Sequence, residues 1–383
     1  NVFNNTFAGI DCIDQYDHVF RGKRLGLITS ISGVNQKLQS TVDILSDKYN
    51  LTALFSPEHG VRGNIGAGDI VENDIDPYTG IPVLSLYRRE SKRLTKEMLE
   101  MADAIVYDIQ DIGTRYFTFI STLYYAMQEC EKNQKEFIVF DRQNPLGGKV
   151  EGNIQNEQFE SFIGAYPLCM RYGMTIGELA DMIYDEQNYH FPLTIISVEG
   201  WKRDMMFPDT DNIWVMPSPG IPRFNTALLY PGTCLFEGTN LSEGRGTAAP
   251  FEIIGAPYVD GYKFARYMNQ KKLPGVMFSP AYFVPSTSKY QGEECQGIHI
   301  HVTEFERYES VKTGIVLLDA FRNCYSKDFG FLKPLEEGGK RSIELLFGNA
   351  MITNETVSLG ELLETMEQDT DTFIKRKEKY QRY

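Results

Sequence analysis

The first 150 residues repeat one pattern: a short apolar run, a polar turn and then an amphipathic stretch. The runs are almost entirely apolar, which is typical of strands buried on both faces of a parallel sheet. Between two of them, residues 116–130 place Phe119, Leu123, Met127 and Cys130 on one face of a predicted helix. The alternation predicts an α/β fold with an open, doubly wound, Rossmann-like parallel sheet, whose strands are residues 25–29, 51–55, 81–86, 104–107 and 137–140.

After residue 150 the pattern changes to a mixture of helices and strands. Residues 175–178 and 358–361 have the sequence of capping boxes, which predicts a helix beginning at each of them. Further elements are predicted from the apolar pattern: strands at residues 193–198 and 297–302 and a helix at residues 311–324.

One segment of this second half, residues 208–257, is rich in proline and glycine. It is far longer than a usual connection between elements, and such long segments are usually functional. The change of pattern predicts two domains that pack closely together. We expect a Rossmann-like domain over residues 1–150 and a smaller C-terminal α+β domain over residues 151–383.

Polar clusters follow the five predicted strands of the first half. In open α/β sheets, ligands bind at the carboxyl ends of the strands, near the point where the strand order reverses. Five clusters at one sheet edge therefore predict a binding site there. The alternative is that these residues are polar only because turns face water. The clusters contain Ser30, Glu58, His59, Tyr87, Asp108, Gln110, Asp111, Asp141, Arg142 and Asn144.

Composition and charge exclude several classes of protein. Hydrophobic residues make up 42% of the 383 residues and charged residues 23%, which indicates a folded globular chain. The net charge of −14 would repel a polyanion, so we expect no nucleic-acid binding. No apolar run approaches the ~18 residues of a membrane span. The six cysteines form no CxxC pair and leave the redox compartment open.

The segment 56–60, Ser-Pro-Glu-His-Gly, presents a glutamate on a tight turn after a strand. Pro57 ends the strand and Gly60 permits the turn, so Glu58 is predicted to lie at the floor of a cleft. A carboxyl group held among apolar side chains can act as a general acid. His59 could take the acid–base role instead. The alternative is that Glu58 only caps the next turn.

The segment 108–116 is dense in side chains that can bind sugar hydroxyl groups. Asp108 and Gln110 share a face if the strand continues, and Arg115 and Tyr116 lie near the start of the next helix. Arg115 could pair with a substrate carboxylate, or it could only neutralise the neighbouring aspartates.

The segment 236–247 concentrates charge around three glycines. Glycine lets the backbone turn tightly and approach a ligand closely. Glu237, Asn240, Glu243 and Arg245 then supply polar groups at that turn. A plain surface loop rarely has this composition, so we predict a functional loop.

Cofactor and metal signatures are missing from the sequence. No G-x-G-x-x-G follows the first strand and no GxxxxGK[ST] loop occurs, so neither a dinucleotide site nor a P-loop phosphate site is indicated. His299 and His301 would share one face of a strand, but a metal would need a third ligand of known position. We interpret them as a structural pair. A metal-dependent hydrolase that also uses His59 is the weaker alternative.

Taken together, these segments resemble the exo-β-N-acetylmuramidases, a glycoside hydrolase family long catalogued as a bacterial domain of unknown function. Two positions depart from the family pattern, since Asn is expected where this chain has Ser30 and Gly220. The resemblance extends over most of the chain, in FSPEHG at 55–60, DIQDIGTRYFTFI at 108–120, DRQNPLGG at 141–148, PSPGIP at 217–222, YPGTCLFEGTNLSEGRGT at 230–247, PFEIIGAP at 250–257 and GIHIHVT at 297–303.

The resemblance implies an active site in the cleft between the two domains and release of N-acetylmuramic acid (MurNAc) from the non-reducing end of peptidoglycan fragments, without a metal or cofactor. It also implies a periplasmic or secreted protein. The chain begins at Asn1, for which a removed signal peptide is one explanation and a trimmed end another. A sugar- or muropeptide-binding protein without turnover is the alternative function.

Glycosidases usually place two carboxyl groups around the scissile bond. Glu58 is our candidate for the general acid, and Asp111 and Glu243 are the catalytic candidates for the second group, with Asp108 and Glu237 also possible. Arg245, Arg115 or Arg62 could clamp the lactyl carboxylate of the sugar. The predicted substrate-binding residues are Ser30, His59, Arg62, Asp108, Gln110, Arg115, Tyr116, Asp141, Arg142, Asn144, Glu237, Asn240 and Arg245.

Overall fold

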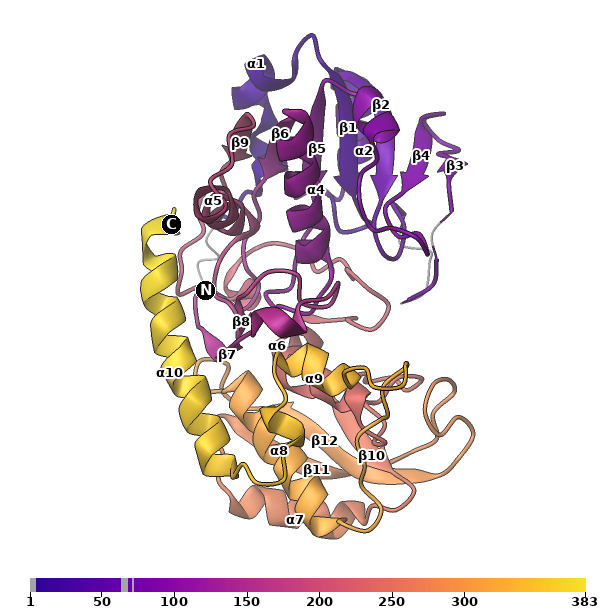
Figure 1. Ribbon diagram of the computed structural model, residues 1–383, viewed down its shortest axis with the longest axis vertical. Coiled ribbons are helices and arrows are strands. Elements are labelled where there is room, and N and C mark those ends of the chain that lie inside the picture. Colours follow the sequence, from indigo (N-terminus) through magenta and orange to yellow (C-terminus); the bar gives the residue numbers. More distant parts are fainter. Residues whose placement is uncertain (1–4, 63–67, 71) are drawn as a thin grey trace.

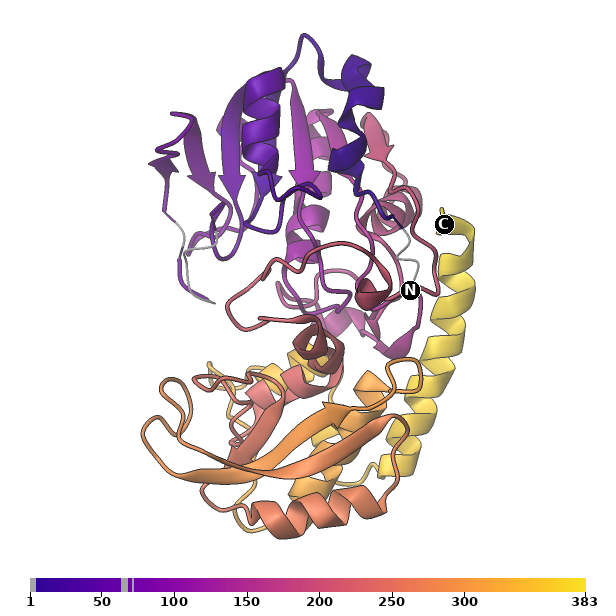
Figure 2. The same ribbon diagram turned by 180° about the vertical axis from the view of Figure 1, so that it is seen from behind.

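The computed structural model describes residues 5–62, 68–70 and 72–383 and consists of two lobes (Figures 1 and 2). The upper lobe is built on a seven-stranded sheet with the order β3-β4-β2-β1-β5-β6-β9. Neighbouring strands run parallel, except that β3 is antiparallel to β4. The strands are β1 (Arg24–Thr29), β2 (Asn50–Ser56), β3 (Asp74–Ile75), β4 (Pro82–Ser85), β5 (Ala104–Asp108), β6 (Glu136–Phe140) and β9 (Leu193–Ile196).

The predicted Rossmann-like sheet is confirmed, and its five strands are β1, β2, β4, β5 and β6. The chain passes from β1 to β2 on one side and later returns to place β5 on the other side of β1, so the strand order reverses between β1 and β5. The division of the chain at residue 150 stays a prediction. β9 lies beyond that residue in the sequence and completes the same sheet beside β6.

Helices cover both faces of this sheet because successive strand side chains point to opposite faces. In β1, Leu25 and Leu27 belong to the core under α2, whereas Ile28 belongs to the core under α4. The first face carries η1 (Gly9–Tyr16), α1 (Asp17–Phe20) and α2 (Thr41–Lys48), and the second carries α3 (Lys96–Glu100), α4 (Phe119–Asn133) and α5 (Ile176–Glu186).

The lower lobe packs helices on a three-stranded antiparallel sheet with the order β10-β12-β11. Its core is continuous with the α4 face of the upper sheet, so the two lobes share apolar packing. The elements are α6 (Phe224–Thr233), η4 (Cys234–Gly238), β10 (Ile253–Ala256), α7 (Gly261–Gln270), β11 (Val276–Phe283), β12 (Cys295–Val302), α8 (Ser310–Cys324) and α9 (Ser342–Phe347).

The proline- and glycine-rich segment 208–257 is more ordered than its composition suggests. It contains α6, whose last turn includes Pro231, and the 3-10 helix η4. Pro231 and the neighbouring Gly232 are unusual in a helix, which is why the sequence pattern does not reveal α6. Gly232 is required because a Cβ there would lie 2.1 Å from the Ser310 carbonyl oxygen of α8.

A long C-terminal helix, α10 (Leu359–Lys377), runs along one edge of both lobes (Figure 1). It lies against the small sheet of β7 (Glu151–Ile154) and β8 (Cys169–Arg171). The last residue, Tyr383, reaches the upper sheet, where its hydroxyl donates to Asp141 Oδ2 at 2.6 Å. The predicted capping boxes at Thr175 of α5 and Ser358 of α10 are both confirmed.

Within the described part of the chain, no helix combines the length and the apolar character that a membrane crossing needs.

Candidate active site

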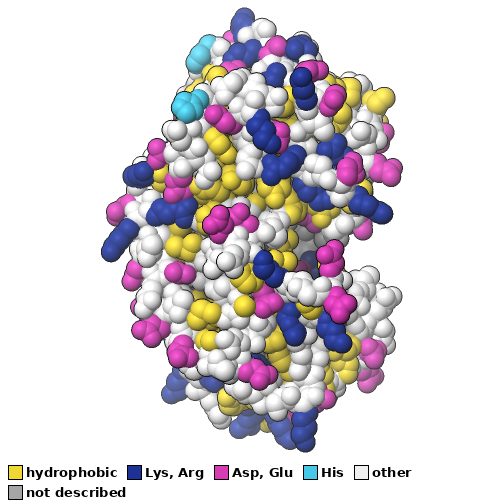
Figure 3. Space-filling model, in the orientation of Figure 1, with side chains coloured by type: hydrophobic (Ala, Val, Ile, Leu, Met, Phe, Trp, Pro, Cys, Tyr) yellow, Lys and Arg dark blue, Asp and Glu magenta, His cyan; other side chains and the backbone are white. Residues whose placement is uncertain are grey.

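A deep pocket lies between the two lobes, where the molecular surface is hollowed (Figure 3). Its cavity volume is about 540 Å³. We call it the cleft pocket; it is lined by Glu58, His59, Gly68, Tyr116, Phe117, Thr118, Phe119, Ile163, Ser218, Ile221, Tyr230, Cys234, Glu237, Glu243, Arg245, Phe251, Ser288, Lys289, Ser342 and Leu346.

Glu58 enters the cleft pocket on a turn directly after β2. Pro57 ends the strand, and the Gly60 amide donates to the Pro57 carbonyl at 3.0 Å to close the turn. Both His59 (φ 71°) and Gly60 (φ 78°) have left-handed backbone conformations. This conformation is strained for a histidine, and such strain is found mainly where a site needs a defined side-chain direction.

Hydrogen bonds orient both carboxyl oxygens of Glu58. Oε1 accepts from the Gly68 amide at 2.9 Å, and Oε2 accepts from the Thr118 hydroxyl at 2.5 Å. Tyr87 lies beside them, and burial together with the Glu58 charge raises its pKa to about 12. The Lys92 ammonium lies 4.1 Å from the centre of the Tyr87 ring. The half-buried Glu58 is therefore held in one place with one face open to the pocket.

A network of four charged side chains forms the opposite wall. Arg245 Nη2 lies 2.6 Å from Glu237 Oε1, and Arg245 Nε lies 3.4 Å from Glu243 Oε1. Lys289 Nζ lies 3.0 Å from Glu243 Oε2 and also donates to three backbone carbonyls. Burial raises the pKa of Glu237, although Arg245 opposes this. Burial alone would lower the pKa of Arg245, but Glu237 raises it above its ordinary value.

Aromatic rings line the space between these two charged groups. Tyr230 packs against Phe117 and Phe251, with ring centres 5.9 Å and 4.9 Å apart. The Arg245 guanidinium stacks over Phe251 at 4.9 Å from the ring centre. Apolar faces with a few fixed polar groups are typical of pockets for organic ligands.

Gly220 leaves space beside Arg245. A Cβ at this position would lie 3.3 Å from Arg245 Nη1 and 3.3 Å from the Phe251 ring. The asparagine expected from the family pattern would therefore lie against the cation. The other departure, Ser30, does not line the cleft pocket; its hydroxyl bonds to that of Ser32 at 2.8 Å just after β1.

Six of the predicted site residues line the cleft pocket: Glu58, His59, Tyr116, Glu237, Glu243 and Arg245. Ten others do not, although they include most of the sheet-edge clusters: Ser30, Arg62, Asp108, Gln110, Asp111, Arg115, Asp141, Arg142, Asn144 and Asn240.

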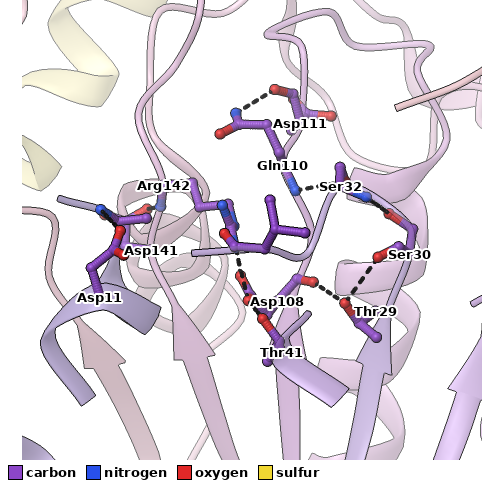
Figure 4. A network of polar contacts seen from close by, with 12 residues as sticks. Asp11, Thr29, Ser30, Ser32, Thr41, Asp108, Gln110, Asp111, Asp141 and Arg142 are labelled. Atoms are coloured by element: carbon purple, nitrogen blue, oxygen red, sulfur yellow. Dashed lines mark hydrogen bonds and ion pairs between the residues drawn. The ribbon is translucent and has the colours of Figure 1, made fainter. Parts of the chain in front are cut away.

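Asp108 and Arg142 bind each other at the sheet edge (Figure 4). Arg142 Nε donates to Asp108 Oδ1 at 2.6 Å, and its Nη2 donates to Oδ2 at 2.9 Å. The Thr41 hydroxyl donates to the same carboxylate at 2.5 Å. Because both charged groups are buried and paired, they connect the ends of β5 and β6 to α2.

Asp141, Asn144 and Asp111 bind backbone groups of their own surroundings. Asp141 accepts from the Gly177 amide at 2.7 Å, at the beginning of α5, and Asn144 donates to the Met174 carbonyl at 2.9 Å. Asp111 accepts from the Gly113 amide at 2.9 Å and from the Tyr172 hydroxyl. Burial raises the pKa of both Asp111 and Asp141 to about 6.

The two arginines proposed beside Arg245 as carboxylate clamps are also occupied elsewhere. Arg115 is fully buried and donates to the carbonyls of Asn153, Leu168, Leu346 and Phe347 at 2.8–2.9 Å. Two of these bonds connect Arg115 to α9, so its role is structural.

Arg62 and Asn240 also lie outside the cleft pocket. Arg62 forms an ion pair with Asp76 at 3.0 Å. Asn240 donates to the Asp328 carbonyl at 2.7 Å and accepts from the Gly330 amide at 3.1 Å, so it anchors a neighbouring loop.

The three histidines of the metal hypothesis are not gathered. His299 and His301 lie side by side on β12, with ring centres 4.3 Å apart, while His59 lies in the cleft pocket against Phe119. Among residues 5–62, 68–70 and 72–383, no group of three or more His, Cys, Asp or Glu side chains is arranged to hold a metal ion.

Several residues of the cleft pocket had not been singled out from the sequence: Thr118, Ser218, Tyr230, Phe251 and Lys289. The first four lie within the segments that carry the family resemblance, and that resemblance was the only feature of the sequence that could have indicated them. Lys289 lies in the connection between β11 and β12 and has no such signal. It comes to the site only because that connection reaches the pocket.

Two family models match the chain one after the other. The N-terminal model of the exo-β-N-acetylmuramidase NamZ family matches residues 25–225. The C-terminal model of the same family matches residues 228–383. Peptidoglycan β-N-acetylmuramidase NamZ of Bacillus subtilis (strain 168) is 43% identical over 380 residues, which cover 97% of this chain and 90% of that protein.

Two crystal structures of DUF1343 family proteins from Bacteroides fragilis NCTC 9343 are similar over 99% of both chains. One has a TM-score of 0.89 at 34% identity and the other a TM-score of 0.77 at 27% identity. The chain therefore belongs to the exo-β-N-acetylmuramidase family of glycoside hydrolases.

Proposed function

We propose that this protein hydrolyses the β-glycosidic bond of a MurNAc residue at the non-reducing end of a peptidoglycan fragment, with Glu58 as the general acid. The observation that carries the proposal is the cleft pocket, which has a fixed carboxyl group on one wall and an arginine and a lysine on the other. The curated relative from Bacillus subtilis acts on peptidoglycan by its name, and it covers nearly the whole chain.

Glu58 would protonate the oxygen of the leaving sugar. Its Thr118 partner suits this task, because a hydroxyl group can donate to the carboxylate and accept from the protonated acid. The Gly68 amide and the Tyr87 hydroxyl keep the carboxyl group in one orientation in both states. General acid catalysis of this kind contributes about 10²–10⁴-fold to a rate.

We propose Glu243 as the second carboxylate. It is buried in the wall of the cleft pocket, whereas Asp111 lies outside that pocket. Lys289 and Arg245 keep Glu243 in place from two sides. The acetamido group of MurNAc is the alternative, since it could assist the reaction from within the substrate and leave Glu243 to orient it.

The cations of the same wall would bind the lactyl carboxylate of MurNAc. Arg245 is about 30% exposed and uses Nη2 and Nε for its two glutamates, while Nη1 faces the space beside Gly220. Arginine binds a carboxylate in a fixed planar geometry. This local charge would hold an acidic sugar in a protein of net charge −14.

The test is release of free MurNAc from a MurNAc-terminated disaccharide. We expect wild-type turnover and a loss of at least about 10²-fold in kcat for Glu58→Gln, because glutamine cannot deliver a proton. Glu97→Gln, at an exposed position of α3, is the matched control and should keep the wild-type rate. An unchanged rate in Glu58→Gln would remove Glu58 from the mechanism.

The same disaccharide separates an enzyme from a protein that only binds. Binding without release of MurNAc by the wild type would favour the binding protein.

Comparing Glu243→Gln with Glu58→Gln then tests the second carboxylate. A catalytic Glu243 predicts a similar loss in kcat, whereas an orienting role predicts a smaller one.

Because peptidoglycan lies outside the cytoplasmic membrane, the proposal also implies a protein of the periplasm or of the cell exterior.

A further inference from the structure

A basic and aromatic surface lies next to Glu58, outside the cleft pocket. Its main part is the connection from β4 to α3, where residues 87–93 carry four cations and one carboxylate. Figure 3 shows Lys and Arg side chains on the upper lobe beside the hollow. The net charge of the chain is −14, and the proposed hydrolysis gives this cationic segment no part. We call the surface the basic strip; it consists of Tyr87, Arg88, Arg89, Lys92, Arg93, Tyr125 and Phe162.

Contacts with Glu58 place the basic strip at the mouth of the cleft pocket. Tyr87 lies beside the Glu58 carboxyl group. Lys92 is close enough for the Glu58 charge to oppose the lowering of its pKa by burial. Phe162 packs on Tyr87 with ring centres 5.6 Å apart, and its chain neighbour Ile163 lines the cleft pocket. Glu58 therefore lies between the interior of the pocket and the strip.

The direction of a bound glycan follows from the two walls of the cleft pocket. In the proposed function, the lactyl carboxylate of the terminal MurNAc binds Arg245 and the glycosidic oxygen faces Glu58. Buried Phe251 and Tyr230 pack behind Arg245, so the glycan cannot continue through that wall. The leaving sugar then begins at Glu58 and continues away from Arg245. The basic strip is the surface that adjoins Glu58 outside the pocket.

The aromatic part of the strip offers an apolar surface to sugar rings. Phe162 contacts both Tyr87 and Tyr125, with ring centres 5.6 Å and 5.9 Å apart, and all three side chains are half-buried. Sugar rings have apolar C–H faces that pack on aromatic side chains. Sites for such ligands combine apolar surfaces with a few polar or charged groups.

The cations of the strip supply positive charge that the chain does not neutralise. Arg88 lies 3.7 Å and Arg93 3.6 Å from a glutamate carboxylate. Neither Arg89 nor Lys92 forms an ion pair with a carboxylate of the described residues. Lys92 is held 4.1 Å from the centre of the Tyr87 ring and donates to the Arg88 carbonyl. An acidic sugar would therefore meet a cation and an aromatic ring together.

We propose that the basic strip binds the peptidoglycan strand on the leaving-group side of the scissile bond, with Arg89 and Lys92 against the lactyl carboxylate of the next MurNAc. The inference rests on the proposed function for the position of the first sugar. A peptidoglycan strand alternates MurNAc with N-acetylglucosamine, so its carboxylates recur along the strand. The preferred substrate is then the end of a longer strand and not a free disaccharide.

Substrate length tests the proposal. The experiment compares kcat/KM for the disaccharide MurNAc–N-acetylglucosamine with kcat/KM for the tetrasaccharide of two such units. We expect the wild type to favour the tetrasaccharide by about 3–10-fold, because an exposed ion pair and an aromatic contact each contribute a few-fold. Equal values for the two substrates would overturn the proposal, and this comparison needs no variant.

Two arginine variants test the charge. Arg89→Gln should lower the ratio of the tetrasaccharide value to the disaccharide value by up to about fivefold, and the exposed position makes misfolding of the variant improbable. Arg21→Gln is the matched control, because Arg21 is exposed and follows α1 at the far end of the upper lobe (Figure 1). An equal ratio in both variants would remove the carboxylate contact.

A second tetrasaccharide separates charge from apolar packing. In it, N-acetylglucosamine replaces the inner MurNAc, so the second carboxylate is missing. We expect Arg89→Gln to leave the ratio for this substrate unchanged, whereas Phe162→Leu should lower the ratio for both tetrasaccharides by about threefold. If Arg89→Gln lowers the ratio for both tetrasaccharides alike, Arg89 does not recognise the carboxylate and the proposal is wrong.

Binding separates this inference from the proposed function. Titration calorimetry with the Glu58→Gln variant measures the affinity of each glycan without turnover, and we expect tighter binding of the MurNAc-containing tetrasaccharide than of the disaccharide. If the wild type releases no MurNAc but this order of affinities holds, the proposed function fails and the strip stands. If the wild type cleaves both glycans with the same kcat/KM, the strip fails and the proposed function stands.

Discussion

At the residue scale, the same side-chain type lines the cleft pocket in one place and stabilises the fold in another. Glu58 follows β2, and Asp108 is the last residue of β5, so both lie at the end of a buried strand of the sheet. Glu58 faces a pocket, whereas Asp108 is fully buried against Arg142 and Thr41. Asp108 is therefore not available to a ligand, because Arg142 from the end of the neighbouring strand β6 neutralises it.

Asp111 predicts a pH dependence of stability. Burial raises its pKa from 3.8 to about 6, so the folded state binds a proton more tightly than the unfolded state. This stabilisation is complete below about pH 4 and is lost as the pH rises through about 6. Asp111→Asn cannot ionise. We expect the wild type to lose unfolding free energy relative to the variant between these pH values, measured by urea denaturation.

The test is whether the difference in unfolding free energy between the two proteins changes with pH. A difference between wild type and Asp111→Asn that stays constant from pH 4 to pH 7 would contradict a raised pKa. Asp141, whose pKa is also raised to about 6, remains in both proteins and cancels in the comparison.

Some site residues could be predicted from the sequence and others could not, for physical reasons. The ion pair of Asp108 with Arg142 joins two strand ends whose neighbourhood the sequence alone does not specify. Both residues were therefore expected to bind substrate. Lys289 could not be predicted because a single lysine between Ser288 and Tyr290, in the connection between two strands, looks like any exposed lysine. The placement of Glu58 and Arg245 on one pocket came from the family resemblance.

At the element scale, the apolar runs of the sheet were predictable because strands buried on both faces have no polar positions to obscure the signal. The edge strand β3 has two exposed residues and gives no such signal. The helix α6 was hidden by Pro231 near its end. Its Gly232 is a packing requirement against α8, which only the tertiary structure reveals.

The end of the chain beyond α10 carries a second prediction. The Tyr383 hydroxyl donates to Asp141 and accepts from the Val198 amide at 2.9 Å. Tyr383→Phe would remove both bonds and lower the unfolding free energy by about 1–3 kcal/mol. Chemical denaturation measures this loss. Tyr282→Phe, at a hydroxyl on the exposed face of β11, should change it by less than about 0.5 kcal/mol.

At the scale of the whole molecule, the two lobes share one apolar core. That core extends from the α4 face of the upper sheet through α6 and α8 to the lower sheet. Lobes joined in this way are expected to unfold together. We predict a single calorimetric transition whose midpoint coincides with the loss of tryptophan fluorescence. Two separate transitions would contradict the shared core.

The helix α10 has a consequence for how the lobes can move. It lies along the edge of the molecule opposite the hollow of the cleft (Figures 1 and 3); it is hydrogen-bonded to β7 and to α5 of the upper lobe and packs against α8 of the lower lobe. These contacts hold the two lobes together along that edge of the molecule. We therefore expect any opening of the cleft to be a rotation about an axis near α10, with the largest displacement at the far rim. A glycan would enter and its products leave by that one side.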